Sequence, residues 1–174
     1  QINFRLADVL YEGGQFGAAV DEYELSAYTY AISPDSARAA YAALSAYQKQ
    51  EAPLIFVIAG TGSSFYASSM IFLQKAFWAA GFHVICLSSP THMNFITTAS
   101  ATSVPGNIAE DSQDLYRVMT KAWEQVKDRI KVSEFYLTGY SLGASQAAFV
   151  SKLDEEKRVF NFKKVCMVNP SVSL

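Results

Sequence analysis

The chain has 174 residues, 51% of them hydrophobic and 14% aromatic, which is enough to bury one moderate core and excludes a disordered protein. Its 14 basic and 16 acidic residues give a net charge of −2, so the sequence offers no basic surface for nucleic acid. No apolar run approaches the roughly 20 residues of a membrane-spanning helix, and no signal peptide is visible. We expect a soluble protein and leave its compartment, cell envelope or cytoplasm, open.

The first 50 residues predict helices, because alanine and leucine are dense and glycine and proline stand only at breaks. Apolar side chains at helical spacing predict two helices separated by Gly13-Gly14. They are Leu6, Leu10 and Tyr11 on the first helix and Phe16, Ala19, Val20 and Tyr23 on the second. Pro34 breaks the pattern, and Ser36 is placed to cap a third helix that runs to about Gln48.

The spacing in this segment resembles one tetratricopeptide repeat, although the usual first-helix tryptophan is absent. The matching positions are Leu6, Ala7, Gly14, Phe16, Ala19, Tyr23, Ser26 and Pro34. A single repeat cannot bury both of its faces, so the resemblance implies a stacking neighbour or a protein partner for residues 1–50. The alternative is an ordinary helical hairpin that packs on the following domain.

From Ala52 onward strands and helices alternate, which predicts a parallel sheet with right-handed crossovers, an α/β fold with helices on both faces. Leu54–Ala59 is a continuous apolar run, typical of a strand buried on both faces. The elements expected next are a helix (Tyr66–Ala80), a strand (His83–Leu87), a polar loop (Ser88–Gly106), a helix (Ile108–Ile130), a strand (Glu134–Thr138), a helix (Leu142–Leu153) and a strand (Lys164–Val168). We therefore divide the chain into a helical segment, 1–50, and an α/β domain, 51–174.

The most informative motif is Gly139-Tyr140-Ser141-Leu142-Gly143, a G-x-S-x-G sequence between an expected strand and an expected helix. In that setting it predicts a nucleophile elbow, a tight turn that exposes a serine hydroxyl above the sheet. The serine backbone is strained in such a turn, and side chains at the two glycine positions would collide across it. Ser141 is the candidate nucleophile, and a plain turn before a helix is the alternative.

Residues 52–174 resemble the N-terminal part of the α/β-hydrolase fold. The resemblance rests on a buried strand that ends in the glycine loop Ala59-Gly60-Thr61-Gly62, a second strand with a long loop, and then the elbow. It implies an oxyanion hole formed by the backbone N–H groups of Leu142 and Thr61. It also implies a substrate bordered by Gly60, Gly62, Tyr140 and His92, with no cofactor and no metal ion. The family often has a histidine before the loop glycine, where this chain has Ala59.

A phosphate-binding loop is an alternative interpretation of Gly60-x-Gly62. The third glycine of a dinucleotide-binding motif would fall at Phe65, and no acidic residue ends the next strand near Leu87. A Gly-Lys-Ser/Thr sequence is absent as well. The sequence therefore favours the hydrolase-like interpretation of this loop.

A serine nucleophile needs a general base and an acid, which in this fold follow the serine along the chain. The two histidines, His83 and His92, both precede Ser141, and Asp154–Glu156 are expected to be a solvated charge run. The simplest explanation is an incomplete chain, since the family has two further strands that carry the acid and the histidine. We expect the chain alone to be inactive. We also expect the edge of Lys164–Val168 to be covered by the N-terminal helices, by another chain or by a removed segment.

The two cysteines, Cys86 and Cys166, lie in apolar strand-like runs and are expected to be buried free thiols. The family's sheet order would put their strands three spacings apart, roughly 14 Å at about 4.8 Å each. A disulfide tolerates at most about 7 Å between Cα atoms.

Two hypotheses about function follow. In the first, the protein is a serine hydrolase that acts on a small-molecule ester, thioester or amide through an acyl-enzyme, with Ser141 as nucleophile. In the second, it is a non-catalytic interaction module, in which residues 1–50 dock a protein partner and the hydrolase-like half is a scaffold.

Overall fold

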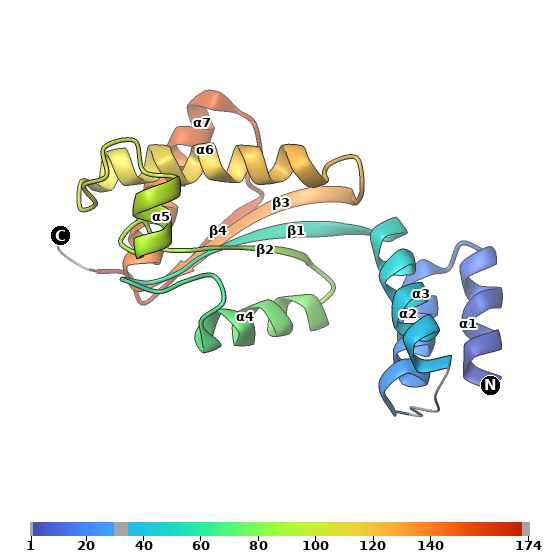
Figure 1. Ribbon diagram of the computed structural model, residues 1–174. Coiled ribbons are helices and arrows are strands. Elements are labelled where there is room, and N and C mark those ends of the chain that lie inside the picture. The colour runs from blue at the N-terminus through green and yellow to red at the C-terminus, as the bar shows by residue number, and fades with distance from the viewer. Residues whose placement is uncertain (1, 30–34, 172–174) are drawn as a thin grey trace. The chain divides into compact units, whose positions relative to one another are not determined.

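The computed structural model describes residues 2–29 and 35–171, and the chain divides into two compact units (Figure 1). The first unit contains residues 1–51 together with 128–131, and the second contains residues 52–127 and 132–174. Each unit has its own hydrophobic core. No helix among the described residues is both long and apolar enough to cross a bilayer.

Three α-helices and one π-helical turn form the first unit. They are α1 (Ile2–Glu12), α2 (Phe16–Glu24), η1 (Leu25–Thr29) and α3 (Asp35–Lys49). The helices match the predicted segments, but the π-helical turn was not predicted, and α3 begins at Asp35, so Ser36 lies within the helix and does not cap it. The predicted break at Pro34 lies outside the described residues.

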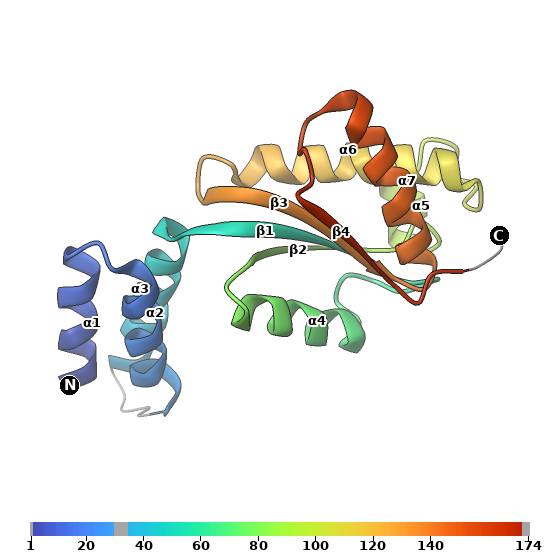
Figure 2. The same ribbon diagram turned by 180° about the vertical axis from the view of Figure 1, so that it is seen from behind.

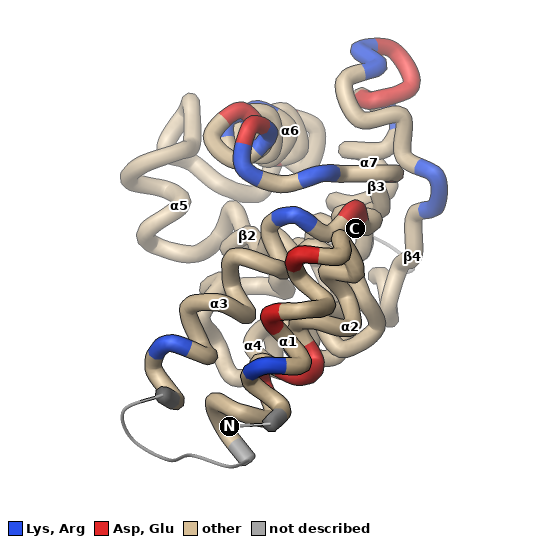
Figure 3. Tube along the Cα trace, turned by 90° about the vertical axis from the view of Figure 1, so that its right-hand side faces the viewer, with Lys and Arg blue, Asp and Glu red and all other residues tan. Residues whose placement is uncertain are grey.

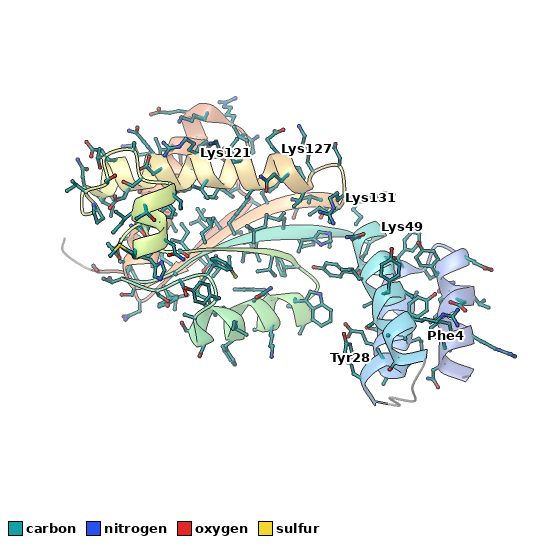
Figure 4. The ribbon with its side chains drawn as sticks, viewed as in Figure 1. Phe4, Tyr28, Lys49, Lys121, Lys127 and Lys131 are labelled. Carbon is teal, nitrogen blue, oxygen red and sulfur yellow. The ribbon has the colours of Figure 1, made fainter. Side chains whose placement is uncertain are left out.

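Most of the side chains in the core of the first unit are small, chiefly alanine, which allows its helices to pack closely. The buried members are Ala7, Ala19, Val20, Tyr23, Ala43 and Ala46. Leu6, which we expected in this core, is 44% exposed, because the neighbouring Ala7 occupies the buried position. The Tyr23 hydroxyl donates to Asp8 at 2.6 Å, and Lys49 in the last turn of α3 lies 4.7 Å from the centroid of the Tyr11 ring (Figure 4).

The charges of the first unit are predominantly acidic, and most of the acids lie on its first two helices (Figure 3). They are Asp8 and Glu12 on α1 and Asp21, Glu22 and Glu24 on α2. Several large apolar side chains are exposed on this unit as well, including Val9 at 65% and Tyr41 at 73%.

The second unit contains a four-stranded sheet in the order β2-β1-β3-β4. The strands are β1 (Glu51–Ile58), β2 (His83–Leu87), β3 (Lys131–Tyr140) and β4 (Lys164–Val168). β1 pairs with β2 in parallel, with Leu54 opposite His83, and β3 pairs with β4 in parallel, with Tyr140 opposite Val168. β1 lies inside the sheet and is almost wholly buried, which explains its uninterrupted apolar sequence.

Helices cover both faces of this sheet, as predicted (Figures 1 and 2). They are α4 (Ser68–Ala79) on one face and α5 (Met93–Thr98), α6 (Ile108–Val126) and α7 (Leu142–Lys157) on the other. Residues of β1 lie alternately on the two faces of the sheet, since successive side chains along a strand point in opposite directions. Ile55 and Val57 pack towards α4, whereas Phe56 contacts Phe135 and Phe160 on the opposite face.

The loop after β2 is more ordered than its polar sequence indicated, because it contains the short helix α5. Two buried carboxylates at the start of α6 hold the segment that follows α5. Asp114 accepts from the Ala101 N–H at 2.8 Å and pairs with Arg117, and Asp111 accepts from the Gly106 N–H at 3.0 Å. Burial raises the pKa of Asp111, the Gly106 N–H lowers it, and the nearby Asp114 charge raises it, with a net increase.

Asp154 corrects the expectation of a solvated charge run at the end of α7. It is only 2% exposed, whereas Glu155 and Glu156 are exposed. Its carboxylate accepts from the Tyr116 hydroxyl at 2.7 Å and from the N–H groups of Phe160 and Phe162 at 3.0 and 3.3 Å. Asp154 therefore anchors the segment that connects α7 to β4.

The cysteines are free thiols on strands three positions apart in the sheet order, as predicted. Cys86 is half-buried, and burial raises the pKa of its thiol to about 11. Cys166 is exposed, which corrects the expectation that both are buried, because β4 is at the edge of the described sheet. No strand among residues 2–29 and 35–171 pairs with the outer edge of β4.

Replacing Asp154 with alanine should destabilise the second unit by about 3 kcal/mol, because the Tyr116 hydroxyl and two backbone N–H groups would lose a buried acceptor. Both tryptophans, Trp78 and Trp123, belong to this unit, so urea unfolding followed by tryptophan fluorescence measures its stability. Glu155→Ala, on the exposed side of the same turn, should change the free energy of unfolding by less than about 0.5 kcal/mol. Equal effects of the two substitutions would contradict the anchoring role.

Candidate active site

The G-x-S-x-G sequence forms a sharp turn between β3 and α7. Ser141 has φ 54° and ψ −126°, a backbone conformation that non-glycine residues rarely adopt and that costs about 1–3 kcal/mol. The Ser141 hydroxyl does not cap the helix that it precedes, so it is free to face outward. The Ser141 N–H donates to the Val168 carbonyl at 3.0 Å, which fastens the turn to the end of β4.

Both glycines of the motif are needed for close approach of backbone to backbone. A Cβ on Gly139 would overlap the Gly143 carbonyl across the turn. A Cβ on Gly143 would overlap the Ile58 carbonyl and lie 2.6 Å from the Ala59 oxygen. The first turn of α7 therefore presses directly against the end of β1, as the sequence motif predicts for an elbow.

The loop after β1 lies against the elbow. A Cβ on Gly60 would lie 3.2 Å from the Ser141 Cβ and 2.7 Å from the Tyr140 ring. The chain then turns through Thr61 and Gly62, with the Ser63 N–H donating to the Gly60 carbonyl at 3.0 Å. Gly62 has φ 65° at the third position of this turn, where glycine is favoured because of its freedom at positive φ. Thr61 is thus the residue next to a glycine that packs against Ser141.

This arrangement places the two predicted oxyanion donors on segments that touch. Leu142 is the first residue of α7, where backbone N–H groups have no acceptor within the helix and the helix dipole favours a negative charge. Thr61 is exposed in the turn that follows Gly60. The arrangement could stabilise an oxyanion beside the Ser141 hydroxyl.

Hydrogen bonds hold the loop after β1 to the loop after β2. The Gly62 N–H donates to the Thr91 hydroxyl at 2.7 Å, and the Ser89 N–H donates to the Ser63 carbonyl at 2.9 Å. The Phe65 N–H donates to the Ser88 hydroxyl at 3.0 Å. The two loops at the carboxyl end of the sheet therefore form one connected rim, the place where open α/β sheets bind ligands.

Tyr140 points to the face of the sheet that α4 covers. Its ring packs with the apolar cluster around Met70, and its hydroxyl lies 3.0 Å from the hydroxyls of both Ser63 and Ser69. Burial raises the pKa of the Tyr140 phenol, but hydrogen bonds with Ser63, Ser69 and the Gly60 N–H lower it, and the net shift is downward. Sequence reasoning missed this network, because nothing in the sequence connects three hydroxyls so far apart along the chain.

The two histidines have different surroundings. His83 is 3% exposed at the start of β2, consistent with the structural role that we expected. His92 caps α5, with its Nδ1 accepting from the Asn94 N–H at 3.2 Å. Its ring lies edge-on to the exposed Tyr66 ring, with 6.3 Å between the ring centroids. Within the described part of the chain, no hydrogen bond to the Ser141 hydroxyl is found. The described residues also contain no group of three or more His, Cys, Asp or Glu placed to hold a metal ion.

No protein-family model matches the sequence, and a search of curated proteins finds no significant match. Solved structures with a similar fold exist. A candidate hydrolase from Legionella pneumophila is 14% identical with a TM-score of 0.51, and the match covers 71% of this chain and 35% of that one. Est1E from Butyrivibrio proteoclasticus, bound to ferulic acid, is 14% identical with a TM-score of 0.50, and the match covers 66% of this chain and 41% of that one.

These matches confirm the predicted fold. The chain has a partial α/β-hydrolase fold, a four-stranded parallel sheet with helices on both faces, preceded by helices. The matched part spans about two fifths or less of the length of these structures. None of the comparisons supports the tetratricopeptide resemblance of residues 1–50, which stays a prediction.

The close contact at Gly143 should make stability sensitive to any side chain at this position. Gly143→Ala should destabilise the second unit by about 3 kcal/mol or more, because the added methyl group meets a backbone carbonyl that cannot move without breaking the sheet. Gly62→Ala is the matched control: its Cβ would enter open space, and only the positive φ is unfavourable, at about 1 kcal/mol. Urea unfolding followed by tryptophan fluorescence compares the two, and a smaller loss for Gly143→Ala than for Gly62→Ala would refute the packing argument.

Proposed function

We propose that the protein is a serine hydrolase of the esterase or acyl-hydrolase type, with Ser141 as its nucleophile. The observation that carries the proposal is the strained Ser141 backbone, with the Gly60 loop packed against its Cβ. A protein does not hold a serine in this conformation without cost, and such strain is concentrated at functional sites. The fold of the second unit and the rim of loops beside the elbow are consistent with this proposal.

In the proposed reaction, the Ser141 oxygen bonds to the carbonyl carbon of an ester, thioester or amide, and its proton passes to a general base. The carbonyl oxygen becomes negative and accepts hydrogen bonds from the Leu142 and Thr61 N–H groups, each worth about 3 kcal/mol in the transition state. The resulting tetrahedral intermediate then collapses and breaks the bond to the alcohol, thiol or amine. This leaving group takes up the proton from the general base. Water then cleaves the acyl-serine and restores the hydroxyl.

The surroundings of the other predicted residues suggest how a substrate would be held. Gly60 and Gly62 form the turn beside Ser141, and His92 lies on the adjoining loop with the exposed Tyr66 ring against it. We propose that this rim borders the substrate. The nitrogen of His92 that does not cap α5, Nε2, remains available for a hydrogen bond to it. The general base and its acid partner are not assigned to any described residue.

The proposal predicts that a fluorophosphonate probe labels Ser141 covalently in the complete protein, because such probes react with activated serine hydroxyls. Peptide mass spectrometry locates the modified residue. Ser141→Ala should abolish the labelling, whereas Ser151→Ala, on the same helix, should leave its rate unchanged. Labelling that persists in Ser141→Ala, or that is absent from the wild-type protein, would refute the role of Ser141.

A second candidate function is a non-catalytic interaction module. It is favoured by the first unit, whose exposed Val9, Tyr28 and Tyr41 side chains suit contact with a protein partner. The labelling experiment separates the two candidates, since an interaction module does not need a reactive Ser141. Absence of labelling together with an intact fold would favour the module.

A further inference from the structure

We propose that Tyr140 is a positioning residue, whose hydroxyl fixes the loop Gly60–Ser63 relative to the Ser141 elbow. This inference rests on the proposed function, because it concerns the loop that would supply the Thr61 N–H to the oxyanion hole. Tyr140 immediately precedes the candidate nucleophile, so whatever its side chain holds is held relative to Ser141.

The Tyr140 hydroxyl joins three segments of the second unit. A phenol has one hydrogen, and it is donated to the Ser63 hydroxyl at 3.0 Å, in the turn after β1. The Ser69 hydroxyl, also at 3.0 Å, must then donate to the phenol oxygen. Ser69 lies in the first turn of α4. The Tyr140 side chain thus contacts both the turn after β1 and the first turn of α4.

The ring of Tyr140 also contacts the loop directly, in addition to the hydrogen bonds of its hydroxyl. It lies against Gly60 so closely that a Cβ there would be 2.7 Å from Cε2. The ring also packs with the apolar cluster that contains Met70 of α4, which restricts its movement. Since the ring is held from the α4 side, the hydroxyl has a fixed position from which to hold Ser63.

Two other hydrogen bonds of this loop lead away from the elbow. The Gly62 N–H is bonded to Thr91, and the Ser63 carbonyl accepts from the Ser89 N–H, both on the loop after β2. The Tyr140–Ser63 hydrogen bond joins the turn to the end of β3, next to Ser141. Without it, the turn would stay attached to the neighbouring loop but could shift relative to Leu142. Such a shift would separate the two proposed oxyanion donors, and donors of this kind act by being preorganised.

Tyr140→Phe tests the proposal, because it keeps the ring and removes the hydroxyl. Tyr136→Phe is the matched control: Tyr136 lies on the same strand and packs in the same cluster, but its hydroxyl donates to Glu134. Four quantities are measured on each variant of the complete protein. They are the hydrogen-exchange rate of the Gly60–Ser63 amides, the rate constant for fluorophosphonate labelling of Ser141, and kcat and KM with an ester substrate.

We expect Tyr140→Phe to raise the exchange rate in this loop and to lower the labelling rate constant, each by about 3- to 10-fold, as the loss of one hydrogen bond would. With an ester substrate, kcat should fall by a similar factor while KM stays unchanged. Ser63→Ala removes only the bond to the loop and should change both rates in the same direction as Tyr140→Phe, which also removes the bond to Ser69. The double variant should be no worse than Tyr140→Phe alone, since that substitution already removes the Ser63 bond. Tyr136→Phe should change none of these quantities.

The outcomes separate this inference from the proposed function. Unchanged loop exchange in Tyr140→Phe overturns the inference, whatever the labelling shows. Faster exchange with an unchanged labelling rate overturns the positioning role, and a change in KM alone would instead assign Tyr140 to substrate contact. A wild-type protein that is not labelled refutes the proposed function and, with it, the catalytic part of this inference. Faster exchange would still support the link between the loop and the elbow.

Discussion

The contact between the first turn of α7 and the end of β1 is the constraint on which the candidate site depends. Gly143 allows the helix to meet the Ile58 and Ala59 carbonyls without an intervening side chain. This contact decides where the Leu142 N–H lies and leaves Ser141 at the top of the turn in its strained conformation. The free energy of that strain must come from the burial of the surrounding sheet, and the elbow packs against the end of β1, which is almost wholly buried.

The rim beside the elbow is held from two sides. The loop after β2 holds the Gly60–Ser63 turn through backbone and threonine hydrogen bonds, and the elbow itself contacts the turn through Tyr140. A donor that is already in place when charge develops needs no reorganisation, and this is the main source of electrostatic catalysis. The hydrogen bonds on both sides of this turn are those that would preorganise the proposed Thr61 donor.

Much of the second unit could be predicted from its sequence. β2 and β4 have the predicted bounds, and α7 begins at the predicted residue, because apolar runs and flanking glycines define strands and turns locally. The helix α5 was missed because it has only six residues, and the segment after it is held by Asp111 and Asp114, which the sequence places on a different element. Such tertiary hydrogen bonds have no local pattern.

The same distinction applies to the candidate site. The proximity of the glycine loop to Ser141 follows from the order of strand, loop and elbow, so it could be predicted. Asp154 was predicted to be solvated because it is followed by two exposed acids. It is buried instead, and the groups that donate hydrogen bonds to it come from α6 and from the segment after α7. The hydroxyls around Tyr140 were missed for the same reason, since serine is common and its partners depend on the fold.

The two close contacts of the elbow region have different consequences for evolution. At Gly143 the obstacle is the backbone of β1, which every residue type has, so no substitution elsewhere could make room for a side chain. At Gly60 the severe overlap, at 2.7 Å, is with the ring of Tyr140, which a smaller residue would remove. The Ser141 Cβ at 3.2 Å is a tight contact that a small shift can relieve. Among homologous sequences, position 143 should therefore be invariant as glycine, whereas positions 60 and 140 should vary together, with a side chain at 60 accompanied by a small residue at 140.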